Sequence, residues 1–253
     1  MKNFVISVIA VLFLSLTCQG SIDSFIVNRY RQIVKLIETG NAKELSKLIA
    51  YPVKRENPLP DITSAAEFVS YYKILFDKVF KDQLKQYNDN IIFQHNGDYG
   101  LVGGGLNGEI WINEKGKIIA INYSSAEEQQ LKQALKAKIK KEMHPDVKDW
   151  KENRLVARSE KLLIRIDETE KGVRYSCWSK GKKMIDQPDI VLYNGIEEMH
   201  GSQGGWSWTF KSGDWTYVVD NVQICGDTEE CGLFLRLLLK GQDHSVIKLR
   251  EIK

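Results

Sequence analysis

The fold of the C-terminal half is decided by residues 206–220, WSWTFKSGDWTYVVD. Large apolar residues occupy every second position on both sides of a short polar segment: Trp206, Trp208 and Phe210, then Trp215, Tyr217 and Val219. A period of two is typical of strands with one buried face, because successive side chains of a strand point to opposite sides. Ser212-Gly213-Asp214 lies between the two runs and predicts a tight turn, so the stretch is interpreted as a β-hairpin.

Similar short runs fill the rest of residues 150–253. Further candidate strands cover residues 162–167, 173–179, 190–193, 197–200, 233–239 and 246–252. Together with the hairpin they make eight strands joined by turns, which predicts an all-β sandwich or a small barrel. The alternation places Trp206, Trp208 and Trp215 in its core. The alternative is that these rings are exposed and stack on sugars, as in a carbohydrate-binding module.

Three segments give this half its most specific pattern: residues 189–195 (DIVLYNG), 201–205 (GSQGG) and 208–217 (WTFKSGDWTY). The pattern resembles the C-terminal β domain of uncharacterised exported proteins of Gram-negative bacteria. The resemblance implies an exported β domain and no particular activity.

The N-terminal half, residues 21–123, is predicted to be an α+β domain. Apolar residues at three- and four-residue steps predict helices over residues 22–37 and 64–80, with a short helix after Asn41 between them. Candidate strands follow at residues 91–95, 99–102, 108–113 and 117–123. Helices followed by a meander predict helices packed on one face of a curved antiparallel sheet. The glycine-rich residues 103–108 are interpreted as a hairpin or bulge, because a strand and not a helix follows them.

This order of elements resembles the nuclear transport factor 2-like (SnoaL-like) fold. The similar segment runs from Tyr51-Pro52 through Phe68 to a group at the end of the domain: Gly100, Gly105, Ile110 and Trp111. The resemblance implies a cone-shaped pocket between sheet and helices; some members are isomerases or dehydratases, and many are binding or structural modules. Tyr72, His95 and Trp111 are the candidate ligand-binding residues of that pocket, and ordinary core packing is the alternative for each.

Residues 124–149 are predicted to form a helical linker to the second domain, residues 150–253. Leu131, Leu135 and Ile139 form its narrow apolar stripe. The lysine run that follows is interpreted as a solvated face suited to a helix C-terminus: Lys136, Lys138, Lys140 and Lys141.

Residues 1–20 are typical of a cleavable signal peptide. A basic start at Lys2 precedes an apolar run over residues 4–16, which is too short to span a bilayer. Cleavage is expected after Gly20. The alternative is a bacterial lipobox ending at Cys18, with a lipid anchor on that residue. Both readings place the protein outside the cytoplasm, in the periplasm or secreted, or as a lipoprotein. No transmembrane segment is expected after residue 20.

The cysteines agree with an oxidising compartment. Cys225 and Cys231 bracket a turn-like pentapeptide between two apolar runs, which predicts a disulfide across a hairpin loop. Cys177 alternates with Val173 and Tyr175, and is interpreted as a buried, inert thiol.

The composition gives no sign of a nucleic-acid partner, since 36 basic residues face 33 acidic ones and the formal net charge is +3. No two of the four histidines stand at a helical ligand spacing, so neither a metal site nor a cofactor nor a catalytic set is predicted. The leading hypothesis is a non-enzymatic binding or structural module of the cell envelope, whose partner is a protein or a small-molecule ligand. The alternatives are a small pocket enzyme in the first domain and carbohydrate or peptidoglycan binding by the β domain.

Overall fold

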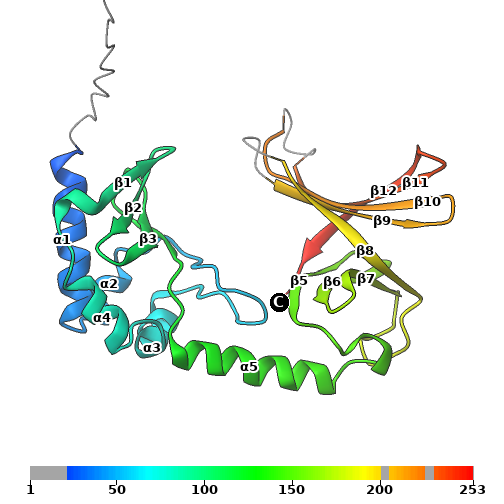
Figure 1. The fold of residues 1–253 in the computed structure, drawn as a ribbon, viewed down its shortest axis with the longest axis horizontal. Helices are drawn as coiled ribbons and strands as arrows, with labels where there is room; N and C mark the ends of the chain where they lie inside the picture. Colours follow the sequence, from blue (N-terminus) through cyan, green and yellow to red (C-terminus); the bar gives the residue numbers. More distant parts are fainter. Residues whose placement is uncertain (1–21, 201–204, 226–230, 253) are drawn as a thin grey trace, which may run out of the picture.

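The computed structural model describes residues 22–200, 205–225 and 231–252. They form an N-terminal α+β unit and a C-terminal barrel, joined by one long helix (Figure 1). The predicted signal peptide, with Cys18 and the expected cleavage site, lies outside the described residues. Within the described residues, no helix combines the length and the apolar character that a bilayer crossing requires.

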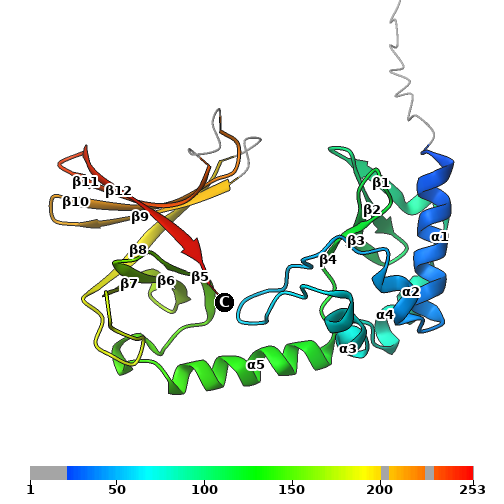
Figure 2. The same cartoon turned by 180° about the vertical axis from the view of Figure 1, so that it is seen from behind.

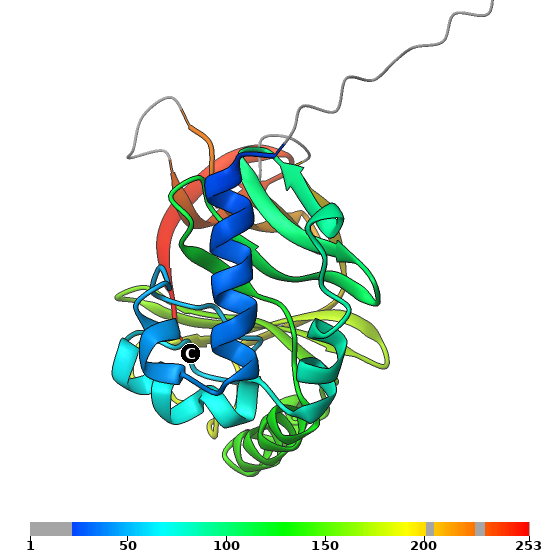
Figure 3. The same ribbon diagram turned by 90° about the vertical axis from the view of Figure 1, so that its left-hand side faces the viewer.

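The first unit packs its helices against a four-stranded antiparallel sheet, as predicted. Its helices are α1 (Ser24–Glu38), α2 (Ala42–Ser46), α3 (Ala65–Leu75) and α4 (Lys78–Leu84), with a 3-10 turn at Asp89–Ile91. Its strands follow one another in the order β1 (Ile92–His95), β2 (Asp98–Gly103), β3 (Leu106–Ile112) and β4 (Ile118–Ile121). Helix α1 runs along the sheet (Figure 3). The buried hydroxyl of Tyr30 joins them, donating to the carbonyl oxygens of Tyr99 at 2.5 Å and Ile110 at 3.2 Å.

The helix expected over residues 64–80 is two helices, which corrects the prediction. Helix α3 ends at Leu75, and Asp77 caps α4 by accepting a hydrogen bond from the backbone nitrogen of Phe80 at 2.9 Å. The apolar period continues through the break because Phe76 and Phe80 are both buried and their rings stack 5.4 Å apart. Periodicity therefore located the buried face but not the cap.

The second unit is a closed eight-stranded antiparallel barrel. Of the two predicted alternatives, a sandwich and a small barrel, the structure therefore has the barrel. Its strands are β5 (Glu152–Arg158), β6 (Leu162–Thr169), β7 (Gly172–Ser179), β8 (Ile190–Met199), β9 (Gly205–Ser212), β10 (Trp215–Val222), β11 (Gly232–Leu239) and β12 (Gln242–Glu251). Each strand pairs with the next in sequence, and β12 closes the barrel against β5 through Arg250 opposite Arg158. The hairpin of residues 206–220 is β9–β10.

Two strands of the barrel differ from the prediction. Strand β5 was not expected, and the two strands expected at residues 190–193 and 197–200 are one strand, β8. Asn194 has a φ of 59° in the middle of β8, beside a register shift in its pairing with β7. A residue with left-handed backbone angles interrupts the alternation of inward and outward side chains. The sequence pattern therefore predicted two short strands on either side of Asn194.

Large side chains fill the barrel. Tyr175, Trp208 and Phe210 are at most 3% exposed and belong to one apolar cluster, with Trp206 half-buried at 4.0 Å from the Trp208 ring. The burial of Trp208 leaves it no open face for a sugar ring. Trp215 corrects the prediction: it lies outside this cluster, half-buried near the ring of His244.

Helix α5 (Ala126–Lys141) connects the two units along one side of the molecule (Figures 1 and 2). Its buried residues are charged: Glu128, Lys132 and Lys136. The predicted apolar stripe of Leu131, Leu135 and Ile139 is only half-buried, and Lys136 is not on a solvated face. Both expectations for this helix are therefore corrected.

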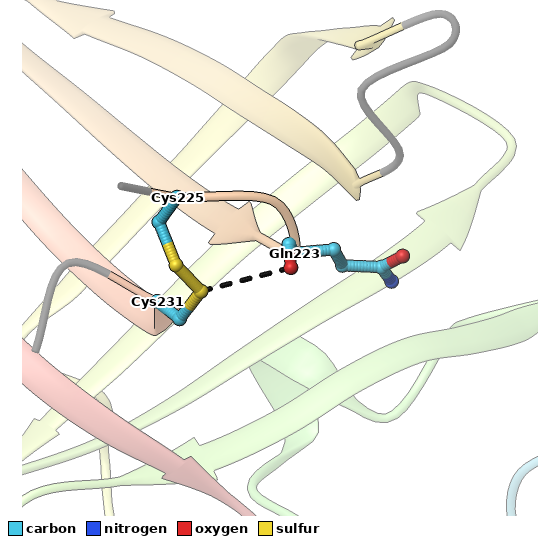
Figure 4. Close-up of a disulfide and its surroundings, with 3 residues drawn as sticks. All are labelled: Gln223, Cys225 and Cys231. Atoms are coloured by element: carbon cyan, nitrogen blue, oxygen red, sulfur yellow. Dashed lines mark hydrogen bonds between the residues drawn. A yellow bond between two sulfur atoms is a disulfide. The ribbon is translucent and has the colours of Figure 1, made fainter. Parts of the chain in front are cut away.

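The predicted disulfide joins Cys225 to Cys231, between β10 and β11 (Figure 4). The Sγ atom of Cys231 lies 3.6 Å from the carbonyl oxygen of Gln223. The third described cysteine, Cys177, is 3% exposed on β7, as expected of an inert thiol, and burial raises the pKa of its thiol.

Candidate functional site

A cleft with a volume of about 1380 Å³ lies beside the barrel, where the two units meet. Asn57 and Pro58 line it from the first unit, and the end of α5, strands β5 and β6, the β7–β8 connection and the end of β12 complete it. Asn57 and Pro58 belong to the loop of residues 53–62, which projects from the first unit toward β5 (Figures 1 and 2). The loop is closed at its base by a bridge between Val53 and Ile62.

The barrel contributes part of its outer face to the walls of the cleft. Along β6, Ile164 and Ile166 point into the barrel core, so Leu163 and Arg165 point outward. Residues 143–150 and the β7–β8 connection cover part of this outer face: Met143, Val147 and Trp150 pack with Trp178 in a separate apolar cluster. The alternation of residues 162–167 places Leu163, Arg165 and Asp167 opposite the core, but nothing in the local sequence predicts that this face is covered.

Apolar groups and cations together line the cleft. Its apolar lining includes Leu162, Leu163, Met184 and Ile185. Eight of the lining residues are basic and two, Glu142 and Glu160, are acidic. The basic residues are Lys141, Arg158, Arg165, Lys180, Lys182, Lys183, Lys248 and Arg250. Because the whole chain is nearly balanced in charge, this lining concentrates positive charge in one place.

Arg165 differs from the other lining cations because it is buried, with a side chain 2% exposed. Its Nε donates to Asp167 Oδ2 at 2.8 Å, and its guanidinium carbon lies 4.6 Å from the centre of the Trp150 ring, in a cation–π contact. Its Nη1 lies 3.9 Å from the sulfur of Met184. Its Nη2 is buried and has no hydrogen-bond partner among the described residues.

A second buried arginine shares the same carboxylate. Arg174 Nη2 lies 3.2 Å from Asp167 Oδ2, and Nη1 donates to Asp149 at 2.9 Å. Asp167 also accepts from Asn153 at 3.0 Å. The side chains of Arg165, Arg174 and Asp167 are at most 2% exposed, whereas that of Asp149 is 72% exposed. Two buried cations therefore share one buried anion.

The loop that lines the cleft is held to α5 by a buried ion pair. Arg55 donates through Nε to Glu128 Oε1 at 2.8 Å and through Nη2 to the other carboxylate oxygen. The guanidinium also donates to the carbonyl oxygens of Ile121 and Tyr123. The two side chains are 5% and 0% exposed, and Ser124 also donates to Glu128 at 2.7 Å. A buried pair with this many hydrogen bonds fixes the geometry of the loop base.

A second group of charges, here called the clasp, connects loop, helix and barrel: Glu56, Lys132, Lys136 and Glu152. Lys132 Nζ lies 2.7 Å from Glu56 Oε2 on the loop and 3.1 Å from Glu152 Oε2 on β5. Lys136 pairs with the other oxygen of Glu152 and donates to the carbonyl oxygen of Lys151 at 2.9 Å. Partial burial raises the pKa of the Glu152 carboxyl, but its hydrogen bonds and ion pairs with Lys136 and Lys132 outweigh burial, so the pKa lies below its ordinary value.

The structure does not bring the three sequence-predicted pocket residues together. Tyr72 is 4% exposed in the core and donates to the carbonyl oxygen of Ile37 at 2.7 Å; burial raises the pKa of its hydroxyl to about 12. His95 is exposed at the end of β1, and Trp111 is half-buried on β3. Tyr72 makes the contacts of a core residue, and a ligand-binding role for the three stays a prediction.

His95 and Trp111 belong to an aromatic group on the sheet face that α1 leaves uncovered. Phe93 lies between them, 6.3 Å from the His95 ring and 6.5 Å from the Trp111 ring. Phe93, Gly100 and Trp111 occupy neighbouring strands in register. A Cβ atom at Gly100 would lie 2.6 Å from the Trp111 ring, so the indole packs over a position that only glycine leaves open.

No group of three or more histidine, cysteine, aspartate or glutamate residues in the described part of the chain has the geometry of a metal site. No family model, no curated protein and no solved structure matches the chain. The resemblances to the nuclear transport factor 2-like fold and to exported β domains therefore stay predictions.

Proposed function

We propose that the chain is a non-enzymatic binding protein of an extracytoplasmic compartment, and that the cleft between the two units binds its ligand. The observation that carries the proposal is the combination of a 1380 Å³ cleft, an apolar lining and a buried arginine with an unpaired donor. Ligand sites are typically concave, largely apolar and provided with a few polar groups that orient the ligand. They also occur preferentially where two domains meet.

The location rests on the disulfide and on the N-terminal sequence. Disulfides such as Cys225–Cys231 persist in oxidising compartments. The apolar run of residues 4–16 supports export. The mass of the N-terminal peptide of the purified protein tests this part: a mature chain beginning at Ser21 supports a secretory signal, and a lipidated Cys18 supports the lipoprotein alternative. An intact Met1 on protein recovered from the cytosol would contradict both.

Binding is tested with N-phenyl-1-naphthylamine, an uncharged probe whose fluorescence rises in apolar surroundings. We expect saturable binding with one probe per chain. Ile185→Lys, which places a charge on an exposed apolar residue of the lining, should weaken binding at least about fivefold, since roughly 1 kcal/mol of apolar contact is lost. Ile196→Lys is the matched control, because Ile196 is similarly exposed, 59% against 51%, and lies on β8 outside the cleft. Equal weakening by both variants, or binding that does not saturate, would refute the assignment of the site.

A further inference from the structure

Arg165 is a buried cation whose hydrogen-bonding capacity is not used up. Its Nη2 has no partner among the described residues, although its Nε is bound to Asp167 and its guanidinium stacks on Trp150. Burying a charged donor without an acceptor costs free energy, and such atoms are rare in folded proteins. An acceptor oxygen brought by a ligand would remove this cost. Arg165 is also one of the residues that line the cleft.

The charges around Arg165 favour an anion with a single charge. Arg165 and Arg174 share the one buried carboxylate of Asp167, and the further partner of Arg174, Asp149, is 72% exposed. Asp149 pairs with Arg174 from this exposed position, so among the fully buried side chains two guanidinium groups face one carboxylate. The carboxylate of a monoanion would add a second buried acceptor, whereas a dianion such as a phosphate monoester would bring two charges and three oxygens to the one donor atom without a partner, Arg165 Nη2.

The surroundings supply both an entrance and a place for a tail. Met184 covers Nη1 of Arg165 at 3.9 Å and is itself half-buried on the β7–β8 connection. Methionine has three rotatable bonds and adapts its shape easily, so a small rotation of this side chain would open a path from the cleft to the guanidinium. Leu162, Leu163 and Ile185 add apolar surface to the same lining.

From this arrangement we infer that the ligand is a single-chain fatty acid, whose carboxylate binds Arg165 Nη2 and whose alkyl chain lies along the apolar lining. The inference rests on the proposed function, since it names the ligand class of that same cleft. The remaining basic residues of the lining attract the anion to the cleft, and Arg165 recognises it. A neutral alcohol of the same chain length lacks the negative charge that would pair with the guanidinium of Arg165.

The test is displacement of N-phenyl-1-naphthylamine by three ligands with the same twelve-carbon chain: dodecanoate, dodecanol and dodecyl phosphate. We expect dodecanoate to bind at least about tenfold more tightly than dodecanol, which is the usual range for a hydrogen bond to a buried charged group. In Arg165→Gln the ratio of the two affinities, measured on the same variant, should fall to less than about twofold. Lys171→Gln is the matched control, since Lys171 is an exposed cation on the barrel outside the cleft.

Each outcome separates the inference from the proposed function. If the probe binds but dodecanol displaces it as well as dodecanoate does, the cleft is a binding site and the fatty-acid assignment is overturned. Tighter binding of dodecyl phosphate also overturns it. If the probe does not bind, the proposed function itself fails.

The wild-type protein provides a second measurement that needs no substitution at a buried position. Dodecanoate labelled with carbon-13 at the carboxyl group is titrated by NMR in the bound state. A nearby buried cation favours the charged form, so the bound carboxylate should stay ionised at a pH at which free dodecanoate is largely protonated. A bound carboxyl that titrates at or above the pH of the free acid would overturn the contact with Arg165.

Discussion

Removal of the charge of Glu152 is expected to destabilise the protein more than truncation of its partner Lys132. The side chains of Lys132 and Lys136 are 8% and 7% exposed, whereas those of Glu152 and Glu56 are 39% and 72% exposed. Glu152→Gln therefore leaves a buried ammonium group at Lys136 without its carboxylate. Lys132→Met leaves two carboxylates that water can reach.

The burial of each partner sets the size of the two effects. An ion left buried without its partner costs about 3–5 kcal/mol when burial is complete. Glutamine still offers an acceptor oxygen, and Lys136 keeps its bond to the carbonyl of Lys151, so we expect about 2–3 kcal/mol for Glu152→Gln. Methionine keeps the apolar contacts of the lysine stem, the Glu56 carboxylate regains water, and Glu152 keeps its ion pair with Lys136. We therefore expect about 1 kcal/mol for Lys132→Met.

Urea unfolding followed by circular dichroism measures both values, and the pH dependence gives an independent check. The pKa of Glu152 is lowered in the folded state, so its contribution is complete above the ordinary value of 4.5 and is lost as the pH falls through the folded-state pKa. The stability of Glu152→Gln should therefore fall less steeply than that of the wild type below about pH 4.5. The reasoning would be refuted by an equal loss of unfolding free energy in the two variants. It would also be refuted if the stability of Glu152→Gln and of the wild type fell equally steeply in acid.

Three further outcomes follow from the barrel. Gly195→Ala should destabilise it by about 1–3 kcal/mol in urea, because the new Cβ would lie 2.3 Å from the ring of Phe210, which is 1% exposed; an unchanged midpoint would contradict this packing. Replacement of Cys225 and Cys231 together by serine should lower the free energy of unfolding by about 2 kcal/mol. A reductant should shift the unfolding transition of the wild type but not that of this double variant. Cys177 should react with iodoacetamide only after the protein is unfolded, and peptide mass mapping measures this reaction. Fast alkylation of the folded protein would show that Cys177 is not buried.

The sequence predicts an all-β domain, either a sandwich or a small barrel, because the alternation of residues 206–220 is typical of strands with one buried face. Trp208 and Phe210 are buried where the alternation expects them. Strand β5 escapes the same reasoning because it contains buried residues in a row, Leu155, Val156 and Ala157. Leu155 and Ala157 face the barrel core, and Val156 faces the cleft. A strand covered on both sides carries no alternation to detect.

Helix α5 shows why the site itself could not be predicted. Its apolar residues pointed to one buried face, yet the buried residues are Glu128, Lys132 and Lys136. Their burial depends on partners elsewhere: Arg55 lies 73 positions from Glu128, and Glu56 lies 76 positions from Lys132. Hydrophobic periodicity predicts which apolar side chains are buried, and it cannot predict ion pairs between residues so far apart in the sequence. The burial of Arg165 could not be predicted for the same reason, since Trp150 and Met184 contact it only in the folded chain.

The position of the clasp links the stability of the protein to the shape of the cleft. Glu56 precedes Asn57, and Glu152 precedes Asn153; both asparagines line the cleft, while the two glutamates meet on Lys132. Ion pairs that lie outside the cleft therefore connect the loop wall to the barrel wall. If the proposed ligand contacts both walls, its binding and the ion pairs of the clasp favour each other by linkage. In the proposed binding protein, charged side chains on α5 would hold the two walls of the cleft together without contacting the ligand, which gives a physical reason for burying lysines where leucines would pack more simply.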